Sequence, residues 1–215
     1  MKVAPVLAAA CVLVASSVAR AEPLPPTGPT RHGAMEDAMR RYFRGELRES
    51  ASFLGVGAGT AFIGGALATQ GEFGVGAASA IFPVSAIEIG AAIVLLARTD
   101  GQLADLVALH RKSPAEYRAE ELPRMRRVKL WFDVYMGVEI GLIALGGASI
   151  AFGVVDHRDG FVGAGVGLAS QAGAMLTFDL FASARADSYT EHIERLTPEI
   201  RPVVGPTGVG VEGRF

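Results

Sequence analysis

Four acidic residues stand inside long apolar stretches of the sequence, where charged side chains are rare. They are Glu88, Asp133, Glu139 and Asp179. An ionised carboxylate in hydrocarbon is costly, so each group must be protonated, hydrated or paired with a cation. Two kinds of chemistry follow from this. The acids either bind a cation or relay protons, or they form ion pairs that hold helices in register.

Nearby polar residues support the first interpretation. Gln171 and Ser85 stand in the same apolar stretches as two of the acids and can supply hydrogen bonds. Pro83 has no backbone N–H, so it leaves the carbonyl of Ser79 without its helical donor, close in sequence to Glu88. Together these groups predict a polar cluster that binds a cation or passes protons.

The basic flanks of the apolar stretches favour the second interpretation. Intramembrane acids often pair with basic residues at the same depth and thereby fix the contact between helices. Such residues are plentiful here: Arg98, Arg185 and the cluster Arg124, Arg126, Arg127 and Lys129. We therefore weight the ion-pair interpretation above the cation-binding one.

Other reactive groups give no motif. The single cysteine, Cys11, lies in the N-terminal apolar run, and the four histidines (His32, His110, His157 and His192) have no spacing typical of a metal site. The glycines Gly163 and Gly167 follow no strand and precede no Lys-Ser/Thr pair, so they are not a phosphate loop. With a net charge of -2, the chain lacks a nucleic-acid footprint. We expect no enzymatic activity, cofactor, metal or nucleic-acid partner.

Four apolar stretches must position the acids: residues 51–69, 73–97, 131–155 and 161–183. Each is long enough, at about 1.5 Å per residue, to cross a hydrocarbon core of about 30 Å. Only short turns separate the members of each pair, which predicts antiparallel hairpins over 51–97 and 131–183. The predicted fold class is an all-α membrane protein with four transmembrane helices. The lipid bilayer is therefore a predicted binding partner of the chain.

The two hairpins resemble copies of one another. An offset of 82 aligns Gly64-Gly65-Ala66 with Gly146-Gly147-Ala148, and an offset of 91 aligns Gly74-Val75-Gly76 with Gly165-Val166-Gly167. The second offset also aligns Glu88 with Asp179. A tandem repeat of helical hairpins is therefore predicted, with chance alignment of glycine-rich sequence as the alternative.

Glycine pairs spaced by four residues mark three of the four stretches. Such pairs place two small residues on one helix face, so that backbones can approach closely. This spacing predicts helix packing within the hairpins and allows a homo-oligomer. The predicted packing residues are Gly55, Gly59, Gly137, Gly141, Gly163 and Gly167.

The remaining segments are predicted from composition and from helical spacing of apolar residues. Ala19-Arg20-Ala21 ends a segment typical of a signal peptide, with cleavage after Ala21. Two amphipathic helices flank the hairpins, and the loop between the hairpins carries short charged helices. The segments are a signal peptide (1–21), a proline-rich linker (22–34), an amphipathic helix (35–50), the charged loop (98–130), a second amphipathic helix (184–197) and a Gly/Pro-rich tail (198–215).

The signal peptide and the charge distribution disagree about orientation. A cleaved signal places the mature N-terminus, and with it the loop 98–130, outside the cytoplasm. That loop carries eight basic residues, whereas the two short turns carry only Arg158, and the positive-inside rule would place the loop in the cytoplasm. A bacterial cell-envelope location follows, with the inner membrane favoured over the outer.

Three functions remain open at this point. The first is a structural or scaffold protein of the envelope membrane, in which glycine-lined hairpins pack within and between copies. The second is a small cation or proton channel or transporter unit that uses the intramembrane acids. The third is a membrane anchor that recruits an unknown envelope protein through the loop 98–130 and the tail.

Overall fold

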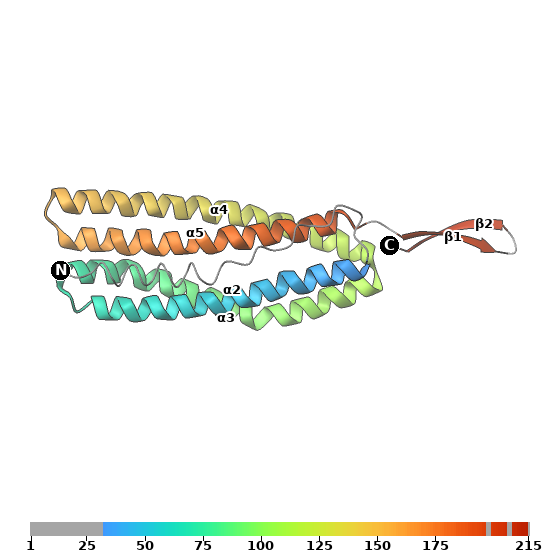
Figure 1. The fold of residues 1–215 in the computed structure, drawn as a ribbon, viewed down its shortest axis with the longest axis horizontal. Helices are drawn as coiled ribbons and strands as arrows, with labels where there is room; N and C mark the ends of the chain where they lie inside the picture. Colours follow the sequence, from blue (N-terminus) through green and yellow to red (C-terminus); the bar gives the residue numbers. More distant parts are fainter. Residues whose placement is uncertain (1–31, 197–198, 206–207, 215) are drawn as a thin grey trace. The chain divides into compact units, whose positions relative to one another are not determined.

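Four long helices and one strand pair make up the part of the chain that the computed structural model describes, which is residues 32–196, 199–205 and 208–214 (Figure 1). Strands β1 and β2 pair in antiparallel register, from Glu199 opposite Arg214 to Gly205 opposite Gly208. The predicted signal peptide (1–21) lies outside the described residues. The elements are α2 (His32–Leu67), α3 (Gly71–Lys112), α4 (Pro114–Val155), α5 (Asp159–Glu194), β1 (Glu199–Gly205) and β2 (Gly208–Arg214).

All four helices are long and apolar enough to span a membrane. Only 17% to 33% of each apolar window is buried within the protein, and large apolar side chains such as Phe62, Val155 and Ile87 are exposed. A surface of this kind is stable against lipid rather than water. The predicted helical membrane fold, with four helices of spanning length, is thereby confirmed.

The helices are longer than the predicted spanning segments. They contain 36 or 42 residues, or about 54 to 63 Å, whereas the hydrocarbon core measures about 30 Å. Residues 35–50, predicted as a separate amphipathic helix, are the first half of α2. Residues 184–194 likewise continue α5. Each helix therefore carries its spanning segment and a polar extension without a break.

The predicted charged loop 98–130 is helical except for one residue. Helix α3 runs to Lys112, and α4 begins at Pro114. Ser113 between them caps α4, since its hydroxyl accepts a hydrogen bond from the backbone N–H of Glu116 at 3.3 Å. Proline at the first helical position also favours this start. The helix continues past Pro123, so the short predicted helix beginning near Pro114 extends to Val155.

The described residues form two compact units, each of which contains part of every helix. The glycine-rich unit comprises Gly57–Ala86 and Tyr135–Leu180. The charged unit comprises the described residues of Pro25–Val56, Ile87–Val134 and Phe181–Phe215. The two units hold their helices together in different ways.

Backbone contacts between helices define the glycine-rich unit. A Cβ atom added to Gly163 on α5 would lie 1.9 Å from the carbonyl oxygen of Phe73 on α3. A Cβ on Gly76 would lie 1.9 Å from the carbonyl oxygen of Gly160. Gly146 on α4 approaches α5 in a similar way. Because no side chain fits at these points, glycine allows the helices to meet backbone to backbone.

Large side chains form the core of the charged unit. They come from all four helices and are at most 8% exposed. The apolar face of residues 35–50 therefore packs against neighbouring helices. The core residues are Met35, Ala38, Met39, Tyr42, Phe43, Val107, Tyr117, Met125, Ala186, Tyr189, Ile193 and Leu196.

Candidate functional site

A pair of carboxyl groups lies inside the glycine-rich unit. Glu139 on α4 is 2% exposed, and its carboxyl group interacts with that of Asp179 on α5. In the described part of the chain, Glu139 forms no ion pair with a basic side chain. Two carboxylates side by side in a low-dielectric place repel one another unless a proton or a cation lies between them. This pair can therefore hold a proton or a small cation.

Glu88, a third acid of the apolar stretches, belongs to the charged unit. It is 1% exposed, and neither oxygen of its carboxyl group has a hydrogen-bond partner among the described residues. Among the described residues it also has no ion-pair partner. Glu88 is thus a single buried acid, and it is described separately from the Glu139–Asp179 pair.

Asp133 differs from the other three acids because it is exposed on α4. Its neighbour Trp131 is 52% exposed, and aromatic residues of this type are common where a helix leaves the membrane. The structure thus places Asp133 on the surface and not within a buried cluster. It does not share the chemistry expected of Glu139 and Asp179.

Four of the six basic residues expected to pair with the buried acids bind other partners. Arg185 forms an ion pair with Glu49 on α2, and Lys129 binds Asp187 at 2.6 Å. Arg124 binds Glu121 at 2.6 Å and Arg126 binds Glu194 at 3.2 Å. Among the described residues, no ion pair involves Glu88 or Glu139.

A set of contacts that we call the boundary contacts joins the helices where their surfaces change from apolar to charged. The Thr99 hydroxyl on α3 donates to Glu46 on α2 at 2.6 Å. The ion pairs Arg185–Glu49 and Lys129–Asp187 join α5 to α2 and to α4. These residues precede or follow the apolar stretches of their helices, so the change from apolar to charged surface falls at these contacts in the charged unit.

Three uncharged polar side chains meet inside the glycine-rich unit. The hydroxyl groups of Thr60 and Ser85 are 2.8 Å apart, and the amide of Gln171 donates to both at 3.2 Å. Ser85 and Gln171 were predicted to support the acids, but the hydrogen bonds described for them join each other and Thr60. Sequence reasoning missed Thr60, whose only signal is a polar residue in an apolar stretch. Interhelical bonds of this type contribute about 0.6 kcal/mol each.

The charged unit contains a buried tyrosine network that sequence reasoning did not identify. Tyr117 and Tyr189 share a hydrogen bond of 2.8 Å between their hydroxyl groups, and Tyr189 also donates to Glu121 at 3.0 Å. Arg124 binds both oxygens of the same carboxylate. Tyr42 stacks on Tyr189, with ring centroids 4.6 Å apart.

Burial makes these tyrosines hard to ionise. It raises the pKa of Tyr42 to about 12, with a further contribution from Glu46. Burial also raises the pKa of Tyr117 and that of Tyr189.

The predicted packing glycines occupy two different environments. Gly163 and Gly167 lie against the backbone of α3. A Cβ atom on Gly55, Gly59, Gly137 or Gly141 would instead meet nothing within 4 Å. These four glycines leave flat, open helix faces within the described chain.

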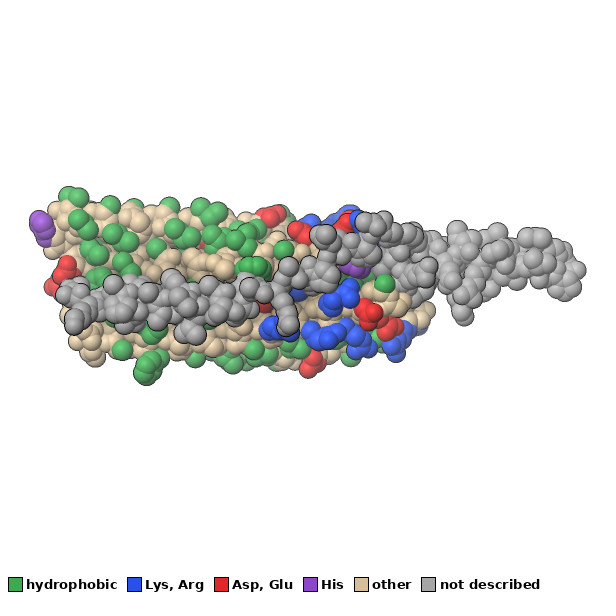
Figure 2. Space-filling view, in the orientation of Figure 1, with side chains coloured by type: hydrophobic (Ala, Val, Ile, Leu, Met, Phe, Trp, Pro, Cys, Tyr) green, Lys and Arg blue, Asp and Glu red, His purple; other side chains and the backbone are tan. Residues whose placement is uncertain are grey.

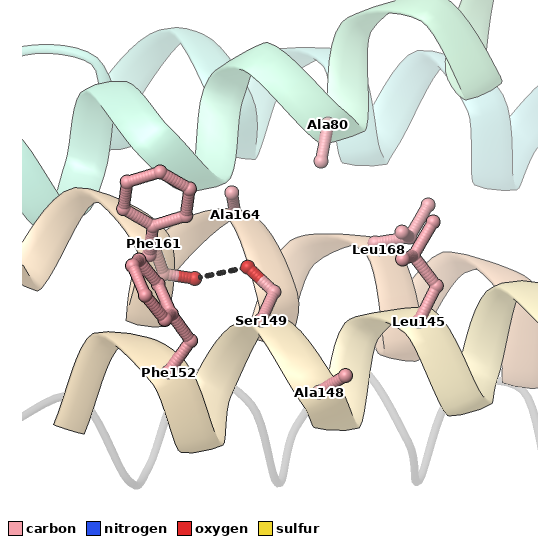
Figure 3. Close-up of a pocket in the computed structure, with 8 residues that line it drawn as sticks. All are labelled: Ala80, Leu145, Ala148, Ser149, Phe152, Phe161, Ala164 and Leu168. Carbon is pink, nitrogen blue, oxygen red and sulfur yellow. Dashed lines mark hydrogen bonds between the residues drawn. The ribbon is translucent and has the colours of Figure 1, made fainter. Parts of the chain in front are cut away.

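An open apolar groove of about 460 Å³ lies between α3, α4 and α5 in the glycine-rich unit (Figure 3). Its polar side chain, Ser149, already donates to the carbonyl oxygen of Phe161 at 2.8 Å. The groove therefore offers hydrocarbon contact and no free polar group. Its lining residues are Ala80, Leu145, Ala148, Ser149, Phe152, Phe161, Ala164 and Leu168.

No group of three or more His, Cys, Asp or Glu side chains that could hold a metal ion occurs among residues 32–196. Comparisons with protein-family models, with curated proteins and with solved structures find no match to the chain.

Proposed function

We propose that this chain is an integral membrane protein that binds protons, or a small cation in their place, as a channel or transporter unit. The observation that carries the proposal is the buried Glu139 carboxyl group, which lies near that of Asp179 and forms no ion pair with a basic side chain in the described part of the chain.

The position of the pair connects its occupancy to helix packing. Glu139 stands on α4 and Asp179 on α5, and these helices touch through Gly146 and Gly165. Loss of the bound proton or cation leaves two negative charges in contact, which pushes α4 away from α5. Binding and release can thereby open and close a path between the two helices.

Flux measurements on the full-length protein in liposomes test this proposal. A trapped pH-sensitive dye, with sodium or potassium gradients in parallel, reports the movement of each ion. Glu139→Gln combined with Asp179→Asn should abolish flux without changing the elution volume in detergent. Asp133→Asn, which removes an exposed acid from the same helix, is the matched control and should retain flux. Wild-type flux equal to that of empty liposomes would contradict the proposal.

A scaffold function is the second candidate, and the open glycine faces favour it. Gly55 and Gly59 on α2, and Gly137 and Gly141 on α4, have free space around them, so another helix can pack there. Gly137→Leu should then dissociate an oligomer measured by light scattering in detergent. The partner-recruiting function is less well supported, because Val107, Tyr117 and Met125 of the segment 98–130 are part of the charged unit's core.

We further propose a bacterial envelope location, preferably the inner membrane, and an origin by hairpin duplication. Ala19-Arg20-Ala21 supports export and cleavage after Ala21. Gly76 and Gly167, which the repeat aligns, both lie at the contact between α3 and α5, as a pseudo-twofold arrangement of two copies requires. Membrane fractionation with N-terminal sequencing tests the location, and a mature chain that begins at Met1 would contradict export.

A further inference from the structure

The polar extension of α2 carries four exposed arginines on one face: Arg40, Arg41, Arg44 and Arg48. Because successive helical residues turn by about 100°, these four fall within a sector of about 100°. The core residues Met35, Met39 and Phe43 lie on a different side of the helix. We call this sector the arginine face of α2.

The arginine face lacks ion-pair partners in the described part of the chain. None of its four arginines forms an ion pair in the described part of the chain, and Arg44 donates only to the carbonyl oxygen of Arg40. Asp37, at the outer end of the same sector, forms no ion pair either. On the other helices, by contrast, most basic side chains bridge to carboxylates: Arg111, Arg124, Arg126, Lys129, Arg185 and Arg195. Figure 2 shows Lys and Arg side chains gathered on the charged unit.

The membrane end of the arginine face lies at headgroup level. The boundary contacts at Glu46 and Glu49 place the membrane surface near the start of the apolar stretch at Ala51. Along the helix axis Arg48 is about 5 Å and Arg44 about 10 Å from Ala51, whereas Arg41 and Arg40 are about 15 Å or more away. The headgroup layer is about 5 to 8 Å thick. Arginine side chains are long enough to bring their guanidinium groups into this layer from a backbone position just outside it.

We propose that Arg44 and Arg48 bind the phosphate groups of anionic phospholipids at this membrane surface. Arg98 on α3, exposed and next to the Thr99 that bonds Glu46, stands at the same level and joins them. A guanidinium group binds two phosphate oxygens at once, which suits this ligand. The position of Arg44 and Arg48 favours lipid over an acidic protein as the ligand, because these arginines lie where headgroups are present at high local concentration.

Lipid selectivity of the full-length protein tests the proposal. Spin-labelled phosphatidylglycerol and phosphatidylcholine, each added to the protein in phosphatidylcholine vesicles, give the relative affinity of the two lipids for the protein surface. The wild type should prefer phosphatidylglycerol by about tenfold. Each arginine should contribute a factor of about five or less to this preference. Arg44→Gln with Arg48→Gln should remove most of this preference, and raised salt should weaken it.

Arg40→Gln with Arg41→Gln is the matched control. It removes the same charge from the same face, but farther from the membrane, and should keep most of the preference. If both double variants lose the preference for phosphatidylglycerol equally, and both bind soluble polyglutamate equally, lipid binding would be overturned in favour of an acidic partner. A wild type without preference would also overturn it. Circular dichroism of each variant checks that helix content is unchanged, and the outcome does not depend on ion flux.

Discussion

Several acidic residues of the charged unit pair with basic side chains, whereas the buried Glu139 of the glycine-rich unit does not. In the charged unit Glu36, Glu49, Glu121 and Asp187 each bind a basic side chain. In the glycine-rich unit Glu139 faces another carboxyl group. The same residue type thus stabilises helix contacts where a cation is supplied, and elsewhere remains available to bind a proton or cation from outside.

The units also differ in how their helices pack. The charged unit buries large side chains such as Phe43 and Tyr117, as a water-soluble bundle does. The glycine-rich unit has backbone contacts and exposes its large apolar side chains to lipid. Apolar burial can stabilise the first unit, whereas close van der Waals contact and interhelical hydrogen bonds must stabilise the second.

The largest expected effect follows from the packing difference. Gly163→Leu places a side chain where the carbonyl oxygen of Phe73 stands 1.9 Å from the new Cβ, so α3 and α5 must separate. We expect almost no folded protein by gel filtration in detergent. Gly137→Leu, at an open position, is the control and should elute as a folded protein. Normal folding of Gly163→Leu would show that the two helices can separate without loss of the fold.

Removing one acid from each unit should change the free energy of unfolding by different amounts. Glu121→Gln leaves Arg124 in a largely buried place with a weakened partner, and it also disturbs the hydrogen bond from Tyr189. We expect a loss of about 2 to 3 kcal/mol in the free energy of unfolding. Glu139→Gln loses no ion pair and should change stability by less than about 1 kcal/mol. Denaturant unfolding followed by circular dichroism measures both, and equal losses would remove the distinction between the units.

The spanning helices could be predicted from sequence because length and hydropathy are local properties of a segment. The sequence did not predict that residues 35–50 continue into α2 or that residues 98–112 continue α3. Amphipathic spacing is the same for a helix on a membrane surface and for one in a bundle. The acids were identified as unusual from sequence alone. Their partners were not, since whether Arg185 binds Asp179 or Glu49 depends on the relative height of α2 and α5.

High pH should act on the charged unit through its buried tyrosines. The raised pKa of Tyr42, about 12, exceeds its unfolded value of 10.0. Its contribution is therefore complete below pH 10 and is lost as the pH rises toward 12. We expect the free energy of unfolding to fall by about 2 kcal/mol over this range. Tyr42→Phe should flatten the decline and Tyr135→Phe, at an exposed position, should not. An unchanged slope in Tyr42→Phe would contradict this.

The smallest expected effect concerns an ion pair at the surface of the charged unit. Glu36 accepts hydrogen bonds from Arg111 at 2.7 and 2.8 Å, and this contact lowers the pKa of Glu36 below 4.5. A lowered pKa means that the contribution is present above pH 4.5 and is lost as the pH falls through the folded value. Arg111→Gln should therefore lower the melting temperature slightly at neutral pH and not at all in acid. Lys112→Gln, the neighbouring exposed residue without an ion pair in the described chain, removes the same charge and should show no such pH dependence. Because water screens exposed pairs, a large effect of Arg111→Gln would mean that surface charges stabilise the charged unit as much as its core does.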